Sequence, residues 1–214
     1  MREYTVIKTD SAAAESGRVW EIAPAAPLDV APWGADYRPV SYGQLVCTDT
    51  DFWVHMVSVE KKANIRAVAT GIHPEVWLDS AMEMFLMPIP DEDSRYINLE
   101  FNTQGALYVG VRHGRADGHL LTETDINIFQ IRNTMEETGE KGMVRWTVTC
   151  RIPFAFLEQH YGKHDFAGFR TMRGNFYKCG DQTPEPHLLV WNMIDYPKPD
   201  FHRPEFFGTF KSEK

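Results

Sequence analysis

Alternation of side chains with a period of two runs through residues 52–172 and constrains the fold more than any other feature. In residues 52–59, FWVHMVSV, every second side chain falls on the same face of an extended chain. Further strand-length runs rich in β-branched and aromatic residues follow, separated by Gly, Asn, Asp and Pro: Ile65–Thr70, Met82–Met87, Tyr96–Phe101, Ala106–Arg112, Ile126–Ile131, Met143–Ile152 and Phe166–Met172. The sequence therefore predicts an all-β fold, an antiparallel β-sandwich of the jelly-roll or immunoglobulin-like kind.

Helical signals are scarce. Pro153–Tyr161 is the best candidate, because Pro153 suits a first helical turn and Gly162 suits the position just after a helix. We therefore expect one or two short helices beside the sandwich. The strand signals show no linker between them, so the sequence predicts a single domain over residues 1–214.

Charge and hydropathy exclude some classes of partner. The net charge is −8 and no stripe of Lys and Arg is present, so we expect no nucleic-acid partner. No run approaches the roughly 18 apolar residues of a membrane helix, so we expect no membrane partner. The first ten residues lack the apolar core of a signal peptide. The chain as given is expected to be cytoplasmic, or secreted if a leader has been removed.

Cysteine usage indicates neither a disulfide framework nor a zinc site. Cys47, Cys150 and Cys179 are three in number and widely spaced, so we interpret them as small buried thiols. Trp146 and Trp191 are likewise assigned to the core.

The closing segment, residues 186–208, reads PHLLVWNMIDYPKPDFHRPEFFG and combines many aromatic side chains with four prolines. Proline excludes a helix and a central strand, because it lacks the N–H group that either would need. The segment is also too aromatic for a solvated linker. We expect an ordered, extended surface segment whose flat side chains are fixed in place. Such side chains can hold a sugar ring or a partner at a low cost in side-chain entropy.

Four stretches in a fixed order carry a further pattern. Trp77–Phe85 has the form W-x-x-x-x-x-E-x-F, and Tyr96–Asn102 is a strand closed by Asn and a nearby Gly. Arg145–Phe154 contains Trp and ends in Ile-Pro-Phe, and Pro204–Gly208 has the form P-x-x-F-G. Together these stretches resemble the family 9 carbohydrate-binding modules over roughly residues 18–210, nearly the whole chain.

The resemblance implies a β-sandwich that holds a sugar ring between two aromatic faces, with calcium as a structural ion. Trp77 matches the first aromatic clamp, and Glu83 matches an acidic residue that accepts hydrogen bonds from sugar hydroxyls. Phe201 falls where the family has a second clamping tryptophan, and His202 beside it could share that role. The implied ligand is a mono- or oligosaccharide.

One family residue has no counterpart at the matching position. An arginine of the family falls near Ile97, which cannot donate a hydrogen bond, so Arg95, Arg112 or Arg173 would have to replace it. Arg173 also begins a polar strand, residues 173–181, that could line a groove together with Asn175. The candidate ligand-binding residues are therefore Trp77, Glu83, Phe201, His202, Arg173 and Asn175.

Calcium has no identifiable binding motif. The acidic run Asp91–Asp93 lacks the spacing of a calcium loop, so no metal-binding residue is assigned.

Besides non-catalytic sugar binding, the sequence leaves two catalytic hypotheses and one cofactor hypothesis. A glycan hydrolase would need two carboxyl groups roughly 5–10 Å apart, and Glu83 with Glu100, or Glu185 with Glu205, offer such pairs without a catalytic signature. A hydrolytic metal site could use a second set of residues: His187, Asp200, His202 and Glu205. The resemblance extends to relatives that hold haem b through Met, His or Lys. Non-catalytic carbohydrate binding is the function that the sequence favours, because no motif of an enzyme is present.

Overall fold

The structure, a computed structural model, describes residues 1–72 and 75–213. The strands are β1 (Glu3–Lys8), β2 (Ala26–Pro27), β3 (Val40–Cys47), β4 (Asp51–Lys61), β5 (Ala81–Met87), β6 (Tyr96–Asn102), β7 (Leu107–Arg112), β8 (His119–Leu120), β9 (Arg132–Glu137), β10 (Met143–Pro153), β11 (Thr171–Cys179), β12 (Leu188–Val190) and β13 (Gly208–Ser212). The two α-helices in the described residues are α1 (Ser11–Ser16) and α2 (Phe154–Tyr161). The five 3₁₀ turns are η1 (Arg18–Glu21), η2 (Lys62–Asn64), η3 (Val76–Leu78), η4 (Ile126–Phe129) and η5 (Pro204–Phe206). The predicted β-sandwich with two short helices is confirmed.

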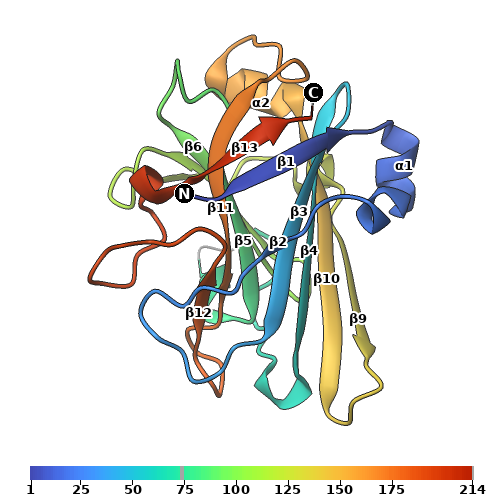
Figure 1. Ribbon diagram of the computed structural model, residues 1–214, viewed down its shortest axis with the longest axis vertical. Coiled ribbons are helices and arrows are strands. Elements are labelled where there is room, and N and C mark those ends of the chain that lie inside the picture. Colours follow the sequence, from blue (N-terminus) through green and yellow to red (C-terminus); the bar gives the residue numbers. More distant parts are fainter. Residues whose placement is uncertain (73–74, 214) are drawn as a thin grey trace.

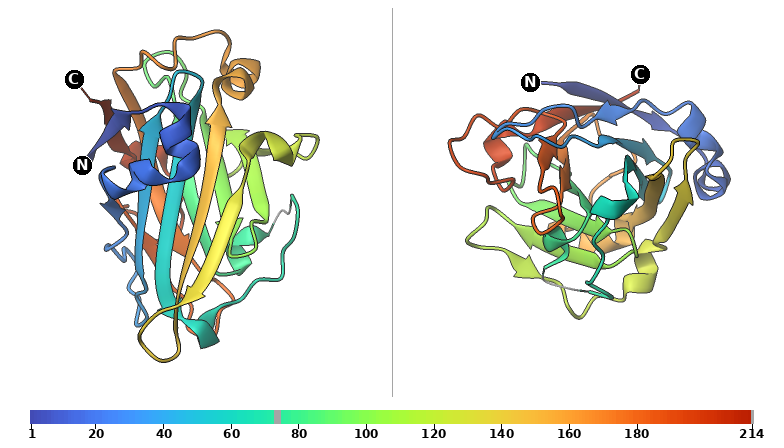
Figure 2. Two further views of the ribbon diagram at one scale, coloured as in Figure 1. Left: turned by 90° about the vertical axis from the view of Figure 1, so that its right-hand side faces the viewer. Right: turned by 90° about the horizontal axis from the view of Figure 1, so that it is seen from below.

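The strands form one curled sheet in the order β8-β7-β6-β5-β11-β13-β1-β3-β4-β10-β9, with β12 beside β11 and β2 beside β3. The view from below in Figure 2 shows these strands curling around a central core. We call β5–β8 and β11–β13 the front layer, and β2–β4, β9 and β10 the back layer. β1 joins the layers, because its first four residues pair with β13 and its last two residues pair with β3 (Figure 1). Both of these pairings are parallel, in contrast to the antiparallel pairs elsewhere in the order.

The main core lies between the two layers and follows from the alternation along each strand. On β5, Met82, Met84 and Leu86 point into this core. Their neighbours Glu83 and Phe85 therefore point to the outer face of the front layer. That face is also covered, by a second apolar cluster to which the closing segment contributes. The predicted burial of Trp146, Trp191 and the three free cysteines is confirmed.

Two predicted strand runs form no strand, and a third is largely wrong, because only Thr171 and Met172 of residues 166–172 belong to β11. Residues 65–70 form no strand, because the backbone N–H groups of Val68 and Ala69 donate to the Asp79 carboxylate instead of to a neighbouring strand. The alternating run at residues 126–131 contains the 3₁₀ turn η4, which Asp125 caps by accepting a hydrogen bond from the backbone of Asn127. The helix expected over Pro153–Tyr161 begins one residue later, with Pro153 as its N-cap and Gly162 as its C-cap.

The closing segment is ordered and irregular, as expected, between β12 and η5. It passes over the outer face of the front layer, where the Phe201 ring stacks on Tyr177 of β11 with ring centroids 4.3 Å apart. Phe207 packs edge-to-face on Tyr96 of β6 at 5.2 Å. No helix in the described residues is both long and apolar enough to cross a membrane.

Candidate functional site

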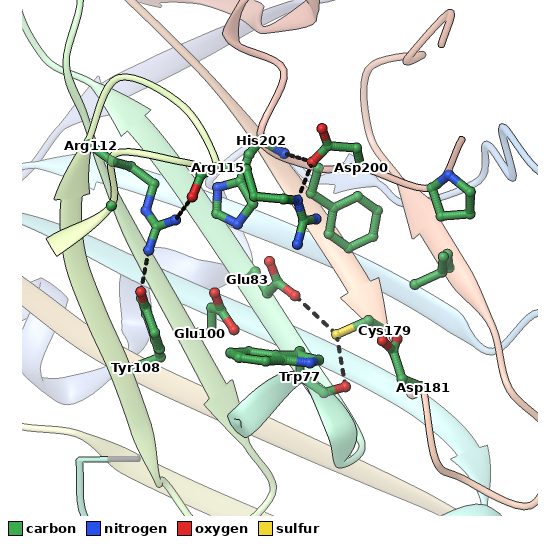
Figure 3. Close-up of a pocket in the computed structure, with 14 residues that line it drawn as sticks. Trp77, Glu83, Glu100, Tyr108, Arg112, Arg115, Cys179, Asp181, Asp200 and His202 are labelled. Atoms are coloured by element: carbon green, nitrogen blue, oxygen red, sulfur yellow. Dashed lines mark hydrogen bonds and ion pairs between the residues drawn. The ribbon is translucent and has the colours of Figure 1, made fainter. Parts of the chain in front are cut away.

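A cavity of about 380 Å³ opens on the outer face of the front layer. Strands β5, β6, β7 and β11 supply its floor, and η3, the loop after β7 and the closing segment supply its walls. Figure 3 shows the carboxyl groups of Glu83 and Glu100 between the Trp77 ring on one side and Arg112 and His202 on the other. The cavity therefore combines an aromatic wall with an acidic floor.

The strand register brings the two glutamates together. Glu83 on β5 lies directly opposite Glu100 on β6, and Glu100 lies opposite Tyr108 on β7. Residues directly opposite on antiparallel strands have Cβ atoms about 4.5–5.5 Å apart. Both glutamates are 3% exposed. Two acidic side chains thus share one small, largely desolvated region.

Burial dominates the electrostatics of this pair. It raises the pKa of Glu83, although the Cys179 thiol donates a hydrogen bond to its carboxylate, with Sγ 3.0 Å from Oε1. Burial, and then the charge of Glu83, raise the pKa of Glu100 well above the ordinary value. Asn98 donates to Glu100 Oε1 at 2.9 Å, whereas Oε2 has no partner in the described residues. Two adjacent buried carboxyls cannot both ionise without cost, so the protein favours the protonated form of at least one of them.

Trp77 lies in η3 and is partly buried, with its ring edge-to-face against Tyr108 at 6.1 Å between centroids. Its backbone is fixed through Asp79, which is fully buried. The Asp79 carboxylate accepts hydrogen bonds from Ala69 N and Asn102 Nδ2, and pairs with Arg66. Burial alone would raise the pKa of Asp79, but these hydrogen bonds and the Arg66 charge hold it below the ordinary value. The turn that carries the indole is therefore anchored by an ionised aspartate.

Arg112, on β7, supplies the guanidinium of the cavity wall. Its Nε donates to Asn98 Oδ1 at 3.1 Å, its Nη2 donates to the Tyr108 hydroxyl, and the residue is 7% exposed. At the rim, Arg115 Nε pairs with Asp200 Oδ1 at 2.9 Å, which ties the loop after β7 to the closing segment.

The aromatic side of the closing segment is largely committed to packing. Phe201 is 7% exposed, because Tyr177 covers one face of its ring and Trp33 lies 5.9 Å from it. His202 Nδ1 is 2.9 Å from the Tyr96 hydroxyl. Burial, followed by the charges of nearby arginines, lowers the pKa of His202 to about 2, so this imidazole is neutral at ordinary pH.

Four of the six candidate residues meet at the cavity: Trp77, Glu83, Phe201 and His202 all line it. The other two lie on the same outer face of β11 but away from it. Asn175 is fully buried and its side chain bonds to the backbone of Asn192. Arg173 donates to the backbone oxygen of Phe207 at 2.9 Å and borders a separate hollow.

Several lining residues were not among the candidates, notably Tyr108, Arg115, Cys179 and Asp181. Tyr108 and Arg112 are four residues apart on β7, so the period of two places both on the face that carries Glu100. This signal was available in the sequence. Arg115 and Asp181 lie outside strands, where no periodic signal exists.

Within the described residues, no group of three or more His, Cys, Asp or Glu side chains is arranged to hold a metal ion. His187 instead receives a hydrogen bond from the buried Lys178, with Nζ 3.0 Å from Nε2. Asp200 pairs with Arg115, and Asp93 with Arg95.

A β-sandwich with an aromatic and acidic cavity on one layer defines a small-ligand-binding module. The chain belongs to carbohydrate-binding family 9, whose sequence profile matches residues 19–212. No curated protein matches the sequence.

Solved structures share the fold. A candidate carbohydrate-binding protein from Bacteroides uniformis is 29% identical over 99% of both chains, with a TM-score of 0.81. A family 9 module from Caldicellulosiruptor kristjanssonii in complex with cellotriose is 12% identical over 99% of this chain and 94% of that one, with a TM-score of 0.60. The same organism's module in complex with glucose is 12% identical over 99% and 96%, with a TM-score of 0.56.

Proposed function

We propose that this protein binds carbohydrate without transforming it, and that the ligand is a mono- or oligosaccharide ring held against Trp77. The observation that carries this proposal is the partly buried indole beside a floor of two buried carboxyls in a cavity of about 380 Å³. Family membership supports it, as do the structures of family 9 modules with glucose and cellotriose.

The chemistry of a sugar matches these surfaces. The C–H face of a pyranose removes apolar area from water when it lies on an indole, on the order of 25 cal/mol per Å². Its hydroxyls can hydrogen-bond to the Glu83 and Glu100 carboxyls and accept a charge-assisted hydrogen bond from the Arg112 guanidinium. Arg112 thus supplies the guanidinium that the family has at the position of Ile97, because Arg95 is engaged by Asp93.

Hydrolysis is a second candidate, since Glu83 and Glu100 are close enough to suggest a carboxyl pair. A glycosidase needs its two carboxyls on opposite sides of the scissile bond. Here both rise from neighbouring strands of one floor, and both have a raised pKa, which disfavours an ionised nucleophile. Release of reducing sugar from a bound oligosaccharide would establish hydrolysis.

An absorbance spectrum of the purified protein tests the separate hypothesis that the protein binds haem.

Replacement of Trp77 tests the binding proposal. A glycan array identifies ligands, and calorimetry then compares wild type with Trp77→Ala. We expect the dissociation constant to rise about thirtyfold, because truncating a central aromatic contact costs about 2 kcal/mol. The folded state should persist, as judged by circular dichroism.

The matched control is Trp20→Ala. Trp20 is also a partly buried tryptophan, but it stacks on His55 of the back layer and does not line the cavity. This variant should bind like wild type. Unchanged affinity in Trp77→Ala would show that the sugar lies elsewhere.

A further inference from the structure

The cavity presents more acidic groups than its basic groups neutralise. Four acidic residues line it: Glu83, Glu100, Asp181 and Asp200. Among the residues that the structure describes, Asp200 is the one of these four that forms an ion pair, with Arg115 at 2.9 Å. Glu83 and Glu100 form the buried floor, and Asp181 stands at the exposed rim. The region next to Trp77 is therefore left with carboxyl groups that lack a cationic partner.

The two buried carboxyls also lack strong hydrogen-bond donors. Glu100 Oε2 is buried and has no donor within the described chain. Glu83 Oε1 receives only the Cys179 thiol, which is a weak donor. A ligand with several strong donors on one atom would satisfy both side chains at once.

The basic residues of the cavity do not balance its acidic groups, and their nitrogens already donate hydrogen bonds within the protein. The Arg112 guanidinium donates to Asn98, Tyr108 and the backbone oxygen of Arg115. Arg115 is occupied by Asp200. His202 contributes no charge near neutral pH, because burial lowers its pKa to about 2. An anionic ligand would therefore meet Glu83, Glu100 and Asp181, which form no ion pair in the described residues, against the single guanidinium of Arg112.

The aromatic wall adds to this preference. The electron-rich face of tryptophan attracts a cation that comes within about 6 Å of the ring centre, and tyrosine does so less strongly. The Trp77 indole lies beside the carboxyl pair, as Figure 3 shows. Acidic oxygens and an indole face on one small site form the surroundings that an ammonium group favours, since it carries a positive charge and three N–H donors.

We propose that the ligand of this cavity is an amino sugar, whose primary ammonium group lies between the Glu83 and Glu100 carboxylates and the Trp77 ring. This assignment rests on the proposed carbohydrate binding, and it narrows the ligand from any hexose to one with a free amine. The ammonium supplies donors to the orphaned Glu100 oxygen and allows both glutamates to ionise together.

A matched set of ligands tests the assignment. Glucose, N-acetylglucosamine and glucosamine share one ring and differ at carbon 2, which carries a hydroxyl, a neutral amide or an ammonium. Cellotriose, triacetylchitotriose and the deacetylated trimer repeat the comparison at oligosaccharide length, and galactose with galactosamine repeats it for another ring. Calorimetry at pH 7 and constant ionic strength should show tenfold or tighter binding of at least one amine over its hydroxyl and amide counterparts. Glucuronate should bind more weakly than glucose.

The outcomes separate the two proposals. Equal or tighter binding of the neutral sugars in every series overturns the amino-sugar assignment and leaves carbohydrate binding intact. If none of these sugars binds and a glycan array is also blank, both proposals fail.

A charge-removing variant tests the role of the pair. Glu100→Gln keeps the shape of the side chain and removes its charge, so the ratio of amine to hydroxyl affinity should fall about tenfold. Glu205→Gln is the control, because Glu205 is exposed and borders the separate hollow rather than this cavity. An unchanged ratio in Glu100→Gln overturns the assignment. The wild-type ligand series decides the question if that variant does not fold.

Discussion

Gly118 leaves the space that the Arg112 guanidinium occupies at the cavity wall. A Cβ at this position would overlap the guanidinium carbon of Arg112. The backbone of Gly118 lies outside the left-handed region, so an alanine would clash with the guanidinium without straining the backbone. We expect Gly118→Ala to push the guanidinium away from Asn98 and Tyr108. Sugar affinity should fall about tenfold, and the free energy of unfolding should fall by about 1 kcal/mol.

The same loop offers the control for this prediction. A Cβ on Gly114 would have no heavy atom within 4 Å, and its φ is also unexceptional. Gly114→Ala should therefore leave both affinity and stability unchanged. Calorimetry and denaturant unfolding measure the two quantities. Wild-type affinity in Gly118→Ala would mean that Arg112 does not contact the sugar.

For individual residues, the sequence could indicate which face of a strand a side chain occupies, but not which segment covers that face. Trp77 and Glu83 carry a motif and line the cavity, and Arg173 and Asn175 share the outer face of β11 without reaching it. The closing segment decides the difference, because it covers Asn175 and leaves Glu83 accessible from the cavity. A long-range contact of this kind has no periodic signature.

Strands β3 and β11 approach each other closely where they face across the core. Gly43 on β3 faces Phe176 on β11, and a Cβ on Gly43 would overlap the phenyl ring. Because Phe176 is fully buried, the ring cannot move into solvent. Gly43→Ala should destabilise the protein by about 1–3 kcal/mol, as overpacked cores do.

Urea unfolding compares this variant with Gly139→Ala, since a Cβ on Gly139 would meet nothing within 4 Å. The control should match wild type. Equal stability of the two variants would show that the layers separate easily at this contact.

The elements that the sequence predicted best are those with a long alternating run and one face in the core. β4 and β10 fulfil this condition, and they pair along eleven residues. β1 and β3 were not identified, although both are real strands. The run at residues 126–131 alternates equally well but turns at Asp125, because a side-chain cap competes locally with strand pairing. Periodicity alone does not settle that competition.

In the whole molecule, β1 holds the two layers together. It pairs with β13 of the front layer and β3 of the back layer, and it places Tyr4 and Val6 in the core. The Tyr4 hydroxyl donates to Pro24 O at 2.6 Å and accepts from Leu45 N at 2.9 Å. Deletion of residues 1–8 should therefore lower the melting temperature by more than 10 °C or abolish folding.

Thermal unfolding followed by circular dichroism measures this effect. Tyr4→Phe removes the hydrogen bonds and keeps the ring, so it should cost only about 1–3 kcal/mol. A deletion variant as stable as wild type would show that the layers close without β1.

The buried carboxyl pair also sets how the stability of the whole molecule depends on pH. The folded pKa of Glu83 and of Glu100 lies above the ordinary value of 4.5, because burial favours the neutral form of both. The charge of Asp181 adds to this rise at Glu83, and the charge of Glu83 adds to it at Glu100. Their contribution to stability is therefore complete below pH 4.5 and is lost as the pH rises through the raised folded values.

Lowered histidine pKa values act in the opposite direction at low pH. Burial lowers the pKa of His55 and His187 to about 4, so their contribution to stability is present above the ordinary value of 6.5 and is lost as the pH falls.

A comparison of variants at each pH separates the effect of the carboxyl pair from that of the histidines. Relative to wild type, Glu100→Gln should gain at least about 1.4 kcal/mol between pH 5 and pH 8, the equivalent of one pKa unit. Glu205→Gln, at an exposed site, should gain nothing over the same range. Denaturant unfolding measures the free energy of unfolding at each pH. If this free energy depends on pH in the same way for wild type and Glu100→Gln, the carboxyl pair is hydrated in the folded protein. The acidic floor would then be open to water, and a ligand would not be needed to supply its hydrogen bonds.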